Sequence, residues 1–505
     1  MSLGFGFRRS EARSLTSYVD AVPAVPLMIV FVLIAAGLRV FTASNTDVSW
    51  IIVMCEKVLD GQRLYTDIIE TNPPATVWLY LPFVAFARAA HLSAEFVIDA
   101  SIFVFALLVM SVCERFLERT EFGQRISSFG LRIGAVFLLL ILPHYTFGER
   151  EHIALIAALP MLCLLMLRLE GETPSTGQMI FAGLCAGLTM VIKPHFALGL
   201  APGVIVASFH AYRQGQSFWR SMFALENWIA AVLVVAYVIA AYVRYPLFFE
   251  EVMPLVTLAY LPNRAPLDAM LFPVLPMMLI IFALTHARGS DLRRPPYSLL
   301  ASMALGFLAV YFVQGKGWPY HSYPALALAG FSLVAAWCEP TQPKGSRLLQ
   351  IVMAVLMGAA SLGWFSLGNK VPEIVAAIKR IKANPSIAII SDDLAFGHPV
   401  TRQVKGTWVQ AYCSSWVLFG VRNQLLYSTL TDEKRQQLTS LEEQHRALMV
   451  GEIATKKPDI LLVQSAPTDW TEWAKEDASL MREIDNYTLV QRFEKANLYA
   501  RKAEQ

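Results

Sequence analysis

Twelve apolar segments occupy the first three quarters of the sequence, and they limit the fold more than any other feature. Their approximate ranges are 22–42, 75–91, 97–113, 131–146, 152–168, 177–192, 196–211, 225–243, 269–286, 297–314, 324–338 and 348–367. Several are shorter than the roughly 20 residues that a helix needs to cross a bilayer, so tilted, extended or re-entrant helices are expected. The mean hydropathy of +0.47 and the 16% of charged residues exclude a soluble protein of this size. The sequence therefore predicts a polytopic α-helical membrane protein with about 11–12 membrane segments.

Basic residues cluster in particular loops, and the positive-inside rule assigns such loops to the cytoplasm. These loops lie near 8–13, 115–125, 213–220, 288–294 and 344–347. The N-terminus is therefore expected in the cytoplasm, with the first apolar segment as an anchor rather than a removed leader. If the segments 22–42, 75–91 and 97–113 all crossed the membrane, the basic loop 115–125 would lie on the outer side. It lies in the cytoplasm if the segment 75–91, which follows Pro73 and Pro74, dips into the outer leaflet without spanning it. The alternative is that the positive-inside signal fails once here.

The last 137 residues differ in character from the rest of the chain. Helical patterns over 372–382 and 431–453 alternate with β-rich runs over 387–391, 458–464 and 487–493. This alternation predicts a small soluble α/β domain over 369–505, following a transmembrane domain over 1–368. By the charge rule the α/β domain lies on the outer side of the membrane.

The outer loop 43–74 separates the first two apolar segments and is rich in acidic residues. It carries Asp47, Glu56, Asp60, Asp67 and Glu70 beside only two basic side chains. Carboxylates at a membrane surface are costly unless they face water, a partner or a substrate. Apolar residues at helical spacing after Asp47 predict a helix that lies along the surface.

The order of residues in this loop resembles a known family pattern. An acidic residue just past the first membrane helix is followed by Gly61, Tyr65 and Asp67 in the spacing G-x-x-x-Y-x-D, and then by Glu70 and a Pro-Pro pair. This resembles the first outer loop of the GT-C glycosyltransferases, in the branch of the protein O-mannosyltransferases and lipid A aminoarabinose transferases. The resemblance implies a GT-C fold.

The same resemblance assigns roles to residues of the loop. It implies that Asp47 is the general base, with Asp67 as a second catalytic candidate and with Tyr65 and Glu70 in substrate binding. At Asn72 the sequence departs from many relatives, which carry lysine before the two prolines.

A second cluster of charged residues, FGEREH over 147–152, stands between two apolar segments. In the resembling family this position brings another acidic residue to the active site. Glu151 is the candidate, because it begins the next helix, where the positive helix end favours a carboxylate or a bound phosphate. Glu149, Arg150 and His152 are candidates for substrate binding. The alternative is a solvated turn in which Glu149 and Arg150 pair.

Two further polar sites interrupt apolar segments on the outer side. Lys193 and His195 flank a proline that breaks the run 177–211, and Lys316, Tyr320 and His321 belong to the turn QGKGWPYHSY over 314–323. A cation at the depth of the outer lipid headgroups is suited to bind a lipid phosphate. The alternatives are a lysine that merely snorkels and aromatic rings that merely anchor the interface.

Other motifs carry no chemistry of their own. The six cysteines are scattered, so a disulfide framework or zinc site is not expected, and no nucleotide-binding glycine loop is present. Ser391, Asp392 and Asp393 follow a predicted strand and are interpreted as a loop cap. No cofactor is required, although Asp47 and the 149–151 carboxylates would suit a divalent cation if they converge.

Together with the resemblance, these features predict an inverting glycosyltransferase of the inner membrane with its C-terminal domain in the periplasm. The donor would be a polyprenyl-phosphate-linked sugar, the acceptor a glycan, lipid or protein, and nucleic acid no partner. One alternative is a polymerase or ligase of a surface polysaccharide. Another is a transporter or flippase of lipid-linked sugars, which would need charge pairs deep within helices and often two matching halves, and neither is seen in the sequence.

Overall fold

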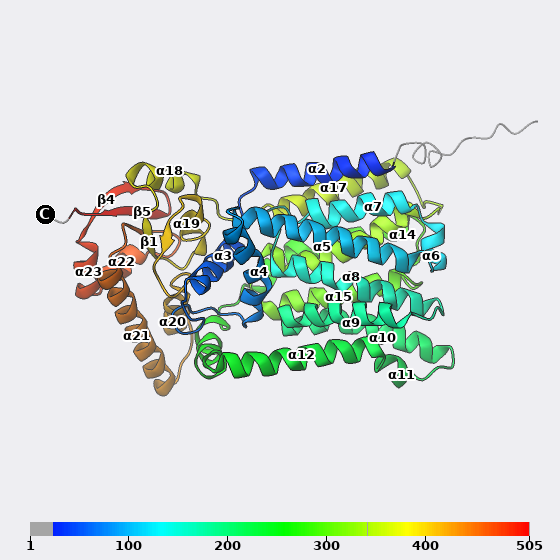
Figure 1. The fold of residues 1–505 in the computed structure, drawn as a ribbon, viewed down its shortest axis with the longest axis horizontal. Coiled ribbons are helices and arrows are strands. Elements are labelled where there is room, and N and C mark those ends of the chain that lie inside the picture. The colour runs from blue at the N-terminus through cyan, green and yellow to red at the C-terminus, as the bar shows by residue number, and fades with distance from the viewer. Residues whose placement is uncertain (1–23, 341, 504–505) are drawn as a thin grey trace, which may run out of the picture.

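The computed structural model describes residues 24–340 and 342–503. The expected basic segment 8–13 lies outside these residues. A long helical bundle fills one part of the molecule, and a smaller domain built on a β-sheet covers one end of it (Figure 1). We call this end of the bundle the sheet end.

The bundle is made of the predicted apolar segments, each of which coincides with a helix. They are α2 (Ala24–Phe41), α4 (Ala75–Ala89), α5 (Ala94–Leu117), α7 (Ser128–Val136) with η1 (Phe137–Ile141), α8 (Arg150–Leu169), α9 (Thr176–Ile192), α10 (Ala197–Arg213), α12 (Leu225–Arg244), α14 (Leu267–Ala287), α15 (Tyr297–Gln314), α16 (Pro319–Cys338) and α17 (Arg347–Phe365). Among the described residues, seven helices are long and apolar enough to cross a membrane, or eight if the bent pair of α2 and α3 counts as one. The chain is thus a multi-pass α-helical membrane protein, as predicted.

Shorter elements connect these helices. They are α3 (Thr46–Leu59), α6 (Glu121–Arg125), η2 (His144–Thr146), η3 (Pro194–Phe196), α11 (Phe218–Met222), η4 (Phe248–Val252), α13 (Met253–Leu255) and η5 (Val256–Tyr260). α6 and α11, which belong to two of the basic loops, lie at the end opposite the sheet domain (Figure 1). These two basic loops and the sheet domain are therefore separated by the length of the bundle.

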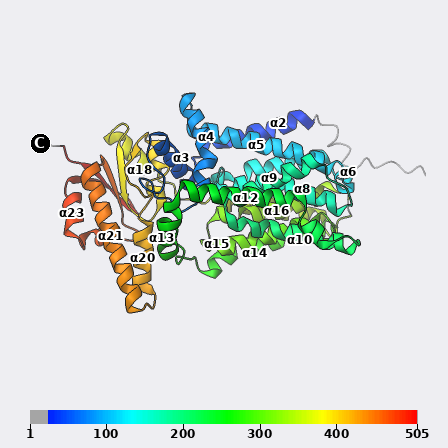
Figure 2. The same ribbon diagram turned by 60° about the horizontal axis from the view of Figure 1, so that its bottom comes forward.

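The helix α4 lies at the sheet end and does not run through the bundle (Figures 1 and 2). Near its start, Trp78 Nε1 donates to the hydroxyl of Tyr245 just past α12 (3.4 Å), and near its end Arg88 pairs with Asp60 at the close of α3 (2.7 Å). Both ends of α4 thus touch elements at the same end of the molecule. With 15 residues it is also too short for a perpendicular crossing. A helix α4 that does not span the membrane agrees with the even number of crossings needed to place the loop 115–125 in the cytoplasm.

The C-terminal domain is a five-stranded mixed sheet with helices around it. Its strands are β1 (Ser386–Ile390), β2 (Thr407–Trp408), β3 (Ile460–Gln464), β4 (Tyr487–Arg492) and β5 (Ala496–Arg501), in the order β2-β1-β3-β5-β4. β2, β1 and β3 run parallel, whereas β5 is antiparallel to both β3 and β4. β1 and β3 are almost fully buried apolar runs, as expected for strands covered on both faces.

The helices of the sheet domain include the two predicted from the sequence. They are α18 (Pro372–Ile381), η6 (Leu394–Phe396), α19 (Val400–Gln403), α20 (Trp416–Tyr427), α21 (Asp432–Lys456), α22 (Trp470–Lys475) and α23 (Ala478–Ile484). The predicted α/β layer is thus present, while β2 and β5 were not predicted.

Candidate active site

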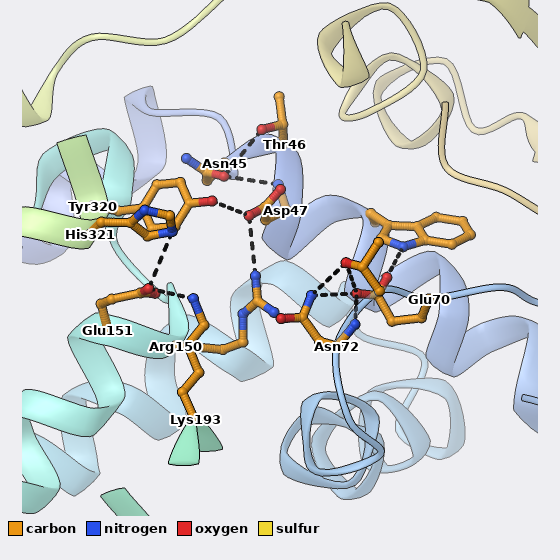
Figure 3. A network of polar contacts seen from close by, with 12 residues as sticks. Asn45, Thr46, Asp47, Glu70, Asn72, Arg150, Glu151, Lys193, Tyr320 and His321 are labelled. Atoms are coloured by element: carbon orange, nitrogen blue, oxygen red, sulfur yellow. Dashed lines mark hydrogen bonds and ion pairs between the residues drawn. The ribbon is translucent and has the colours of Figure 1, made fainter. Parts of the chain in front are cut away.

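A cluster of charged and polar side chains lies at the sheet end of the bundle, where four separate parts of the chain meet (Figure 3). Asp47 comes from the start of α3, Arg150 and Glu151 from the start of α8, Lys193 from the break between α9 and α10, and Tyr320 and His321 from the start of α16. We call these residues, together with Glu149 and Gln314, the charged cluster. Most of the predicted site residues belong to it.

Asp47 connects α3 to two other helices. Its Oδ2 atom accepts a hydrogen bond from the hydroxyl of Tyr320 (2.7 Å) and one from Nη2 of Arg150 (3.2 Å). The helix cap is Asn45, whose side chain accepts from the backbone N–H of Asp47 (2.9 Å). The Asp47 carboxylate therefore does not cap the helix. Its Oδ1 atom meets no hydrogen-bond donor among the described residues.

Glu151 forms the second centre of the charged cluster. Its Oε1 atom accepts from Nζ of Lys193 (2.6 Å) and lies 3.6 Å from Nε2 of His321. Nζ of Lys193 also donates to Oε1 of Gln314 at the end of α15 (2.9 Å). Pro194 permits this contact, because it ends α9 and turns the chain, and Lys193 points toward Glu151 (Figure 3).

A π-helix next to α8 fixes the turn that carries these charges. In a π-helix each hydrogen bond spans one residue more than in an α-helix, and such segments are frequent at functional sites. The carbonyl of Leu139 in η1 lies 2.7 Å from Nε2 of His152, while Nδ1 of His152 accepts from the N–H of Gly148 (3.1 Å). Both ring nitrogens are thus used by the backbone, so His152 positions the turn. Its proposed contact with substrate remains a prediction.

Several polar atoms of the charged cluster are buried and meet no partner within the described part of the chain. They are both carboxylate oxygens of Glu149, Nε and Nη1 of Arg150, Oε2 of Glu151, Nε2 of Gln314 and Nδ1 of His321. Burial, and after it the neighbouring Asp47 carboxylate, raise the pKa of Glu149 well above its usual value. Since an unpaired buried polar atom costs about 1–3 kcal/mol, such a concentration marks a place suited to a polar ligand.

Other predicted residues lie outside the charged cluster. Asp67 is partly exposed, and hydrogen bonds from the backbone N–H and the side chain of Arg63 hold its carboxylate and lower its pKa. Tyr65 donates to the carbonyl of Asn72 (2.7 Å), and Glu70 accepts from Trp50 Nε1 (2.6 Å) and from the N–H of Asn72 (2.9 Å), so both hold the outer loop in shape. Their roles in catalysis or binding remain predictions.

Lys316 and His195 have neighbours of their own. Nζ of Lys316 donates to the carbonyls of Tyr260 (2.8 Å) and Asn263 (2.6 Å) and lies over the Tyr260 ring at 3.8 Å. Burial lowers the pKa of Lys316 to about 8. His195 packs edge-on against Phe196, and its Nε2 atom meets no partner among the described residues. The predicted phosphate contact of Lys316 remains untested.

The sequence did not single out Gln314, which closes α15 directly before the glycine turn. Its only sequence signal is its place at the start of the polar turn 314–323, beside Lys316 and aromatic residues of more distinctive chemistry. Gln314 meets Lys193 because α15 and the α9–α10 break are neighbours in space. The described residues include no group of three or more His, Cys, Asp or Glu side chains placed to hold a metal ion.

No protein-family model matches the sequence, and no curated protein matches it as a relative. Solved structures do match the fold. ArnT from Cupriavidus metallidurans bound to undecaprenyl phosphate has a TM-score of 0.57 at 15% identity, over 96% of this chain and 98% of that chain. The apo state of the same protein gives 0.56 at 12% identity, over 94% and 98%. The predicted GT-C-like fold is thus confirmed, over nearly the whole length of both chains.

Proposed function

We propose that this protein is a glycosyltransferase of the inner membrane that uses a polyprenyl-phosphate-linked sugar. It transfers the sugar, with inversion at the anomeric carbon, to a hydroxyl group of a glycan, lipid or protein on the periplasmic face. The observation that carries the proposal is one juxtaposition: the Asp47 carboxylate, whose Oδ1 atom is open, contacts Arg150 through Oδ2, and the Nε and Nη1 atoms of Arg150 meet no acceptor among the described residues. A base and an anion-binding group thus stand side by side at one end of a membrane bundle.

The carboxylate of Asp47 is suited to activate the acceptor. Its side chain is 19% exposed, so a hydroxyl group can approach, while Tyr320 and Arg150 fix its Oδ2 atom. In the reaction the acceptor oxygen forms a bond to the anomeric carbon, and its proton passes to Asp47. The bond from the anomeric carbon to the phosphate oxygen breaks, and polyprenyl phosphate leaves with the electron pair.

Arg150, Lys193 and Gln314 are suited to hold the leaving phosphate. Negative charge grows on the phosphate as its bond to the sugar breaks, and prearranged buried donors stabilise that charge without reorganising. Arg150 and Lys193 have side chains that are only 5% and 8% exposed. Both lie at the sheet end of the bundle, and in this proposal the phosphate headgroup of the donor lipid binds there. The solved complex of ArnT, a protein of the same fold, with undecaprenyl phosphate supports a donor of this class.

A transfer assay tests the proposal. The purified protein in phospholipid vesicles would receive polyprenyl-phosphate sugars labelled in the sugar, with lipid, glycan and protein fractions as acceptors. We expect one polyprenyl phosphate released for each new glycosidic bond, with the opposite anomeric configuration in the product. Movement of labelled donor across the bilayer without release of polyprenyl phosphate would instead identify a transporter. Growth of a polymer or joining of finished chains would identify a polymerase or ligase.

A further inference from the structure

The sheet domain makes charged contacts with the outer loop that carries Asp47. Arg402, on α19, donates from Nη1 to Glu56 of α3 (2.6 Å), and from Nε (2.5 Å) and Nη2 (3.2 Å) to Glu95 at the start of α5. Only 17% of the Arg402 side chain is exposed. One guanidinium group of the sheet domain thus ties α3 to the first turn of a membrane helix.

Aromatic and backbone contacts extend this junction along α3. The ring of Trp50 packs against His398 (5.0 Å between centroids) and Trp408 (6.5 Å), and Nζ of Lys57 donates to the carbonyl of Gln410 (2.8 Å). Trp50, Glu56 and Lys57 are therefore all held from the same domain, over the whole length of a short helix.

Asp47 lies in the first turn of the same helix, one turn before Trp50. α3 leaves α2 at a bend of 74°, so the membrane helix does not continue into it and does not set its direction. The contacts of Asp47 with Tyr320 and Arg150 are hydrogen bonds of 2.7 and 3.2 Å, which weaken when α3 shifts by a few tenths of an ångström. The orientation of α3 therefore determines the geometry of the base.

We infer that the sheet domain is part of the catalytic apparatus and that Arg402 is a positioning residue, which acts on Asp47 through α3. The inference rests on the proposed function for its kinetic consequence. Arg402 touches neither the donor phosphate groups nor the acceptor in this scheme. Its loss should therefore lower kcat and leave the KM for the donor lipid unchanged.

Kinetics and hydrogen exchange together test this inference, with Arg435→Gln as the matched control, because Arg435 is exposed on α21. We expect Arg402→Gln to lower kcat roughly 10- to 100-fold, the range in which a misplaced catalytic group acts. In an Asp47→Asn background the same change should cost nothing further, because both act through one group. Arg435→Gln should change neither kcat nor the KM for the donor lipid. Equal losses in the two backgrounds would show that Arg402 does not act through Asp47.

Amide hydrogen exchange provides a measurement that does not depend on glycosyltransferase activity. Arg402→Gln should speed amide exchange in 46–59 and leave 150–169 and 319–338 unchanged, and unaltered exchange in 46–59 would overturn the inference. If the wild-type protein transfers no sugar, the proposed function fails, and the inference is then judged by exchange alone. Should Arg402→Gln not fold, Glu56→Ala, which removes one ion pair of the same junction, takes its place.

Discussion

Asp47 and Asp67 belong to one acidic stretch, yet their carboxylates meet different surroundings. Asp47 faces a tyrosine hydroxyl and a buried guanidinium, whereas 40% of the Asp67 side chain is exposed and its partner Arg63 is a close neighbour in sequence. A carboxylate held by groups from remote helices is suited to catalysis. A carboxylate paired within its own turn mainly shapes that turn.

We predict that Asp47→Asn lowers turnover roughly 10²–10⁴-fold, because asparagine keeps the shape but cannot take a proton. Binding of the lipid donor should persist. Helix capping is not the cause of such a loss, because Asn45 supplies the cap. Turnover and donor binding, both normalised to folded protein, provide the measurement. Asp67→Asn is the control and should remain near normal; a large loss there, with Asp47→Asn active, would move the role of base to Asp67.

Lys193 and Lys316 are both cations at the sheet end, but their ammonium groups have different partners. Lys193 binds Glu151 and Gln314 within the charged cluster, whereas Lys316 binds two backbone carbonyls near η5. We predict that Lys193→Gln raises the donor KM roughly tenfold or more, since a charge-assisted contact contributes about 1.5–3 kcal/mol. Lys316→Gln should raise it less.

Donor titration of the two lysine variants decides between these roles. An equal rise in KM for Lys316→Gln would show that Lys316 contacts the phosphate, as the sequence predicts. Because Lys193→Gln leaves Glu151 buried without its cation, thermal unfolding must accompany the kinetics. If the variant is unstable, the double change Lys193→Gln with Glu151→Gln removes both charges together.

At the scale of elements, the contact between α20 and η5 joins the sheet domain to the bundle. A Cβ atom on Gly420 would collide with the backbone carbonyl of Ala259, so only glycine permits this approach. Gln424, one turn later, donates to the carbonyl of Leu258 (2.8 Å). Tyr260, over which Lys316 stacks, ends this same π-helix. Close packing of α20 therefore positions η5.

We predict that Gly420→Ala destabilises the protein by about 1–3 kcal/mol, the usual cost of overpacking. Gly451→Ala is the matched control, because Gly451 lies on helix α21 with no atom near the position of an added Cβ. That change should stabilise the helix by roughly 0.5–1 kcal/mol. The apparent unfolding temperature of both variants is the measurement, and a Gly420→Ala protein as stable as wild type would contradict the packing argument.

At the scale of the whole molecule, the bundle separates two sets of loops. Arg119 pairs with Glu172 (3.0 Å) in the loops that follow α5 and α8. The helix α6, which begins two residues after Arg119, lies at the end opposite the sheet domain (Figure 1). Thr71 lies in the outer loop, and Ser440 is exposed on α21. If the basic loops face the cytoplasm, the outer loop and the sheet domain face the periplasm.

We predict that an impermeant thiol reagent added from the periplasmic side labels Thr71→Cys and Ser440→Cys but not Arg119→Cys. Of the six native cysteines, Cys55, Cys113, Cys163 and Cys185 are buried, and all six would be replaced by serine or alanine beforehand. Permeabilised membranes supply the control, because position 119 must then react. Labelling at position 119 in intact cells, with none at position 71, would show that the topology is the reverse of the one proposed.

The sequence by itself determined the helices of the bundle, because backbone groups in a membrane must be satisfied within each helix, so each apolar run marks an element. It also indicated α4 as a segment that enters the outer leaflet without spanning the membrane, and β1, β3 and β4 as strands. Each of these signals is local: a proline pair, a run of apolar residues, a change in period. β5 was missed because its burial follows from pairing with β3 and β4 rather than from a periodic pattern of its own.

Only the tertiary structure decided which polar groups meet. Asp47 reaches Arg150 across 103 residues and Tyr320 across 273, and Lys193 reaches Gln314 across 121. No spacing rule connects positions so far apart, since helix packing brings them together. The same packing directed Lys316 to backbone carbonyls and left Nε and Nη1 of Arg150 without an acceptor among the described residues. Residue type therefore gave the candidates, and the meeting of helix ends determined which of them share a site.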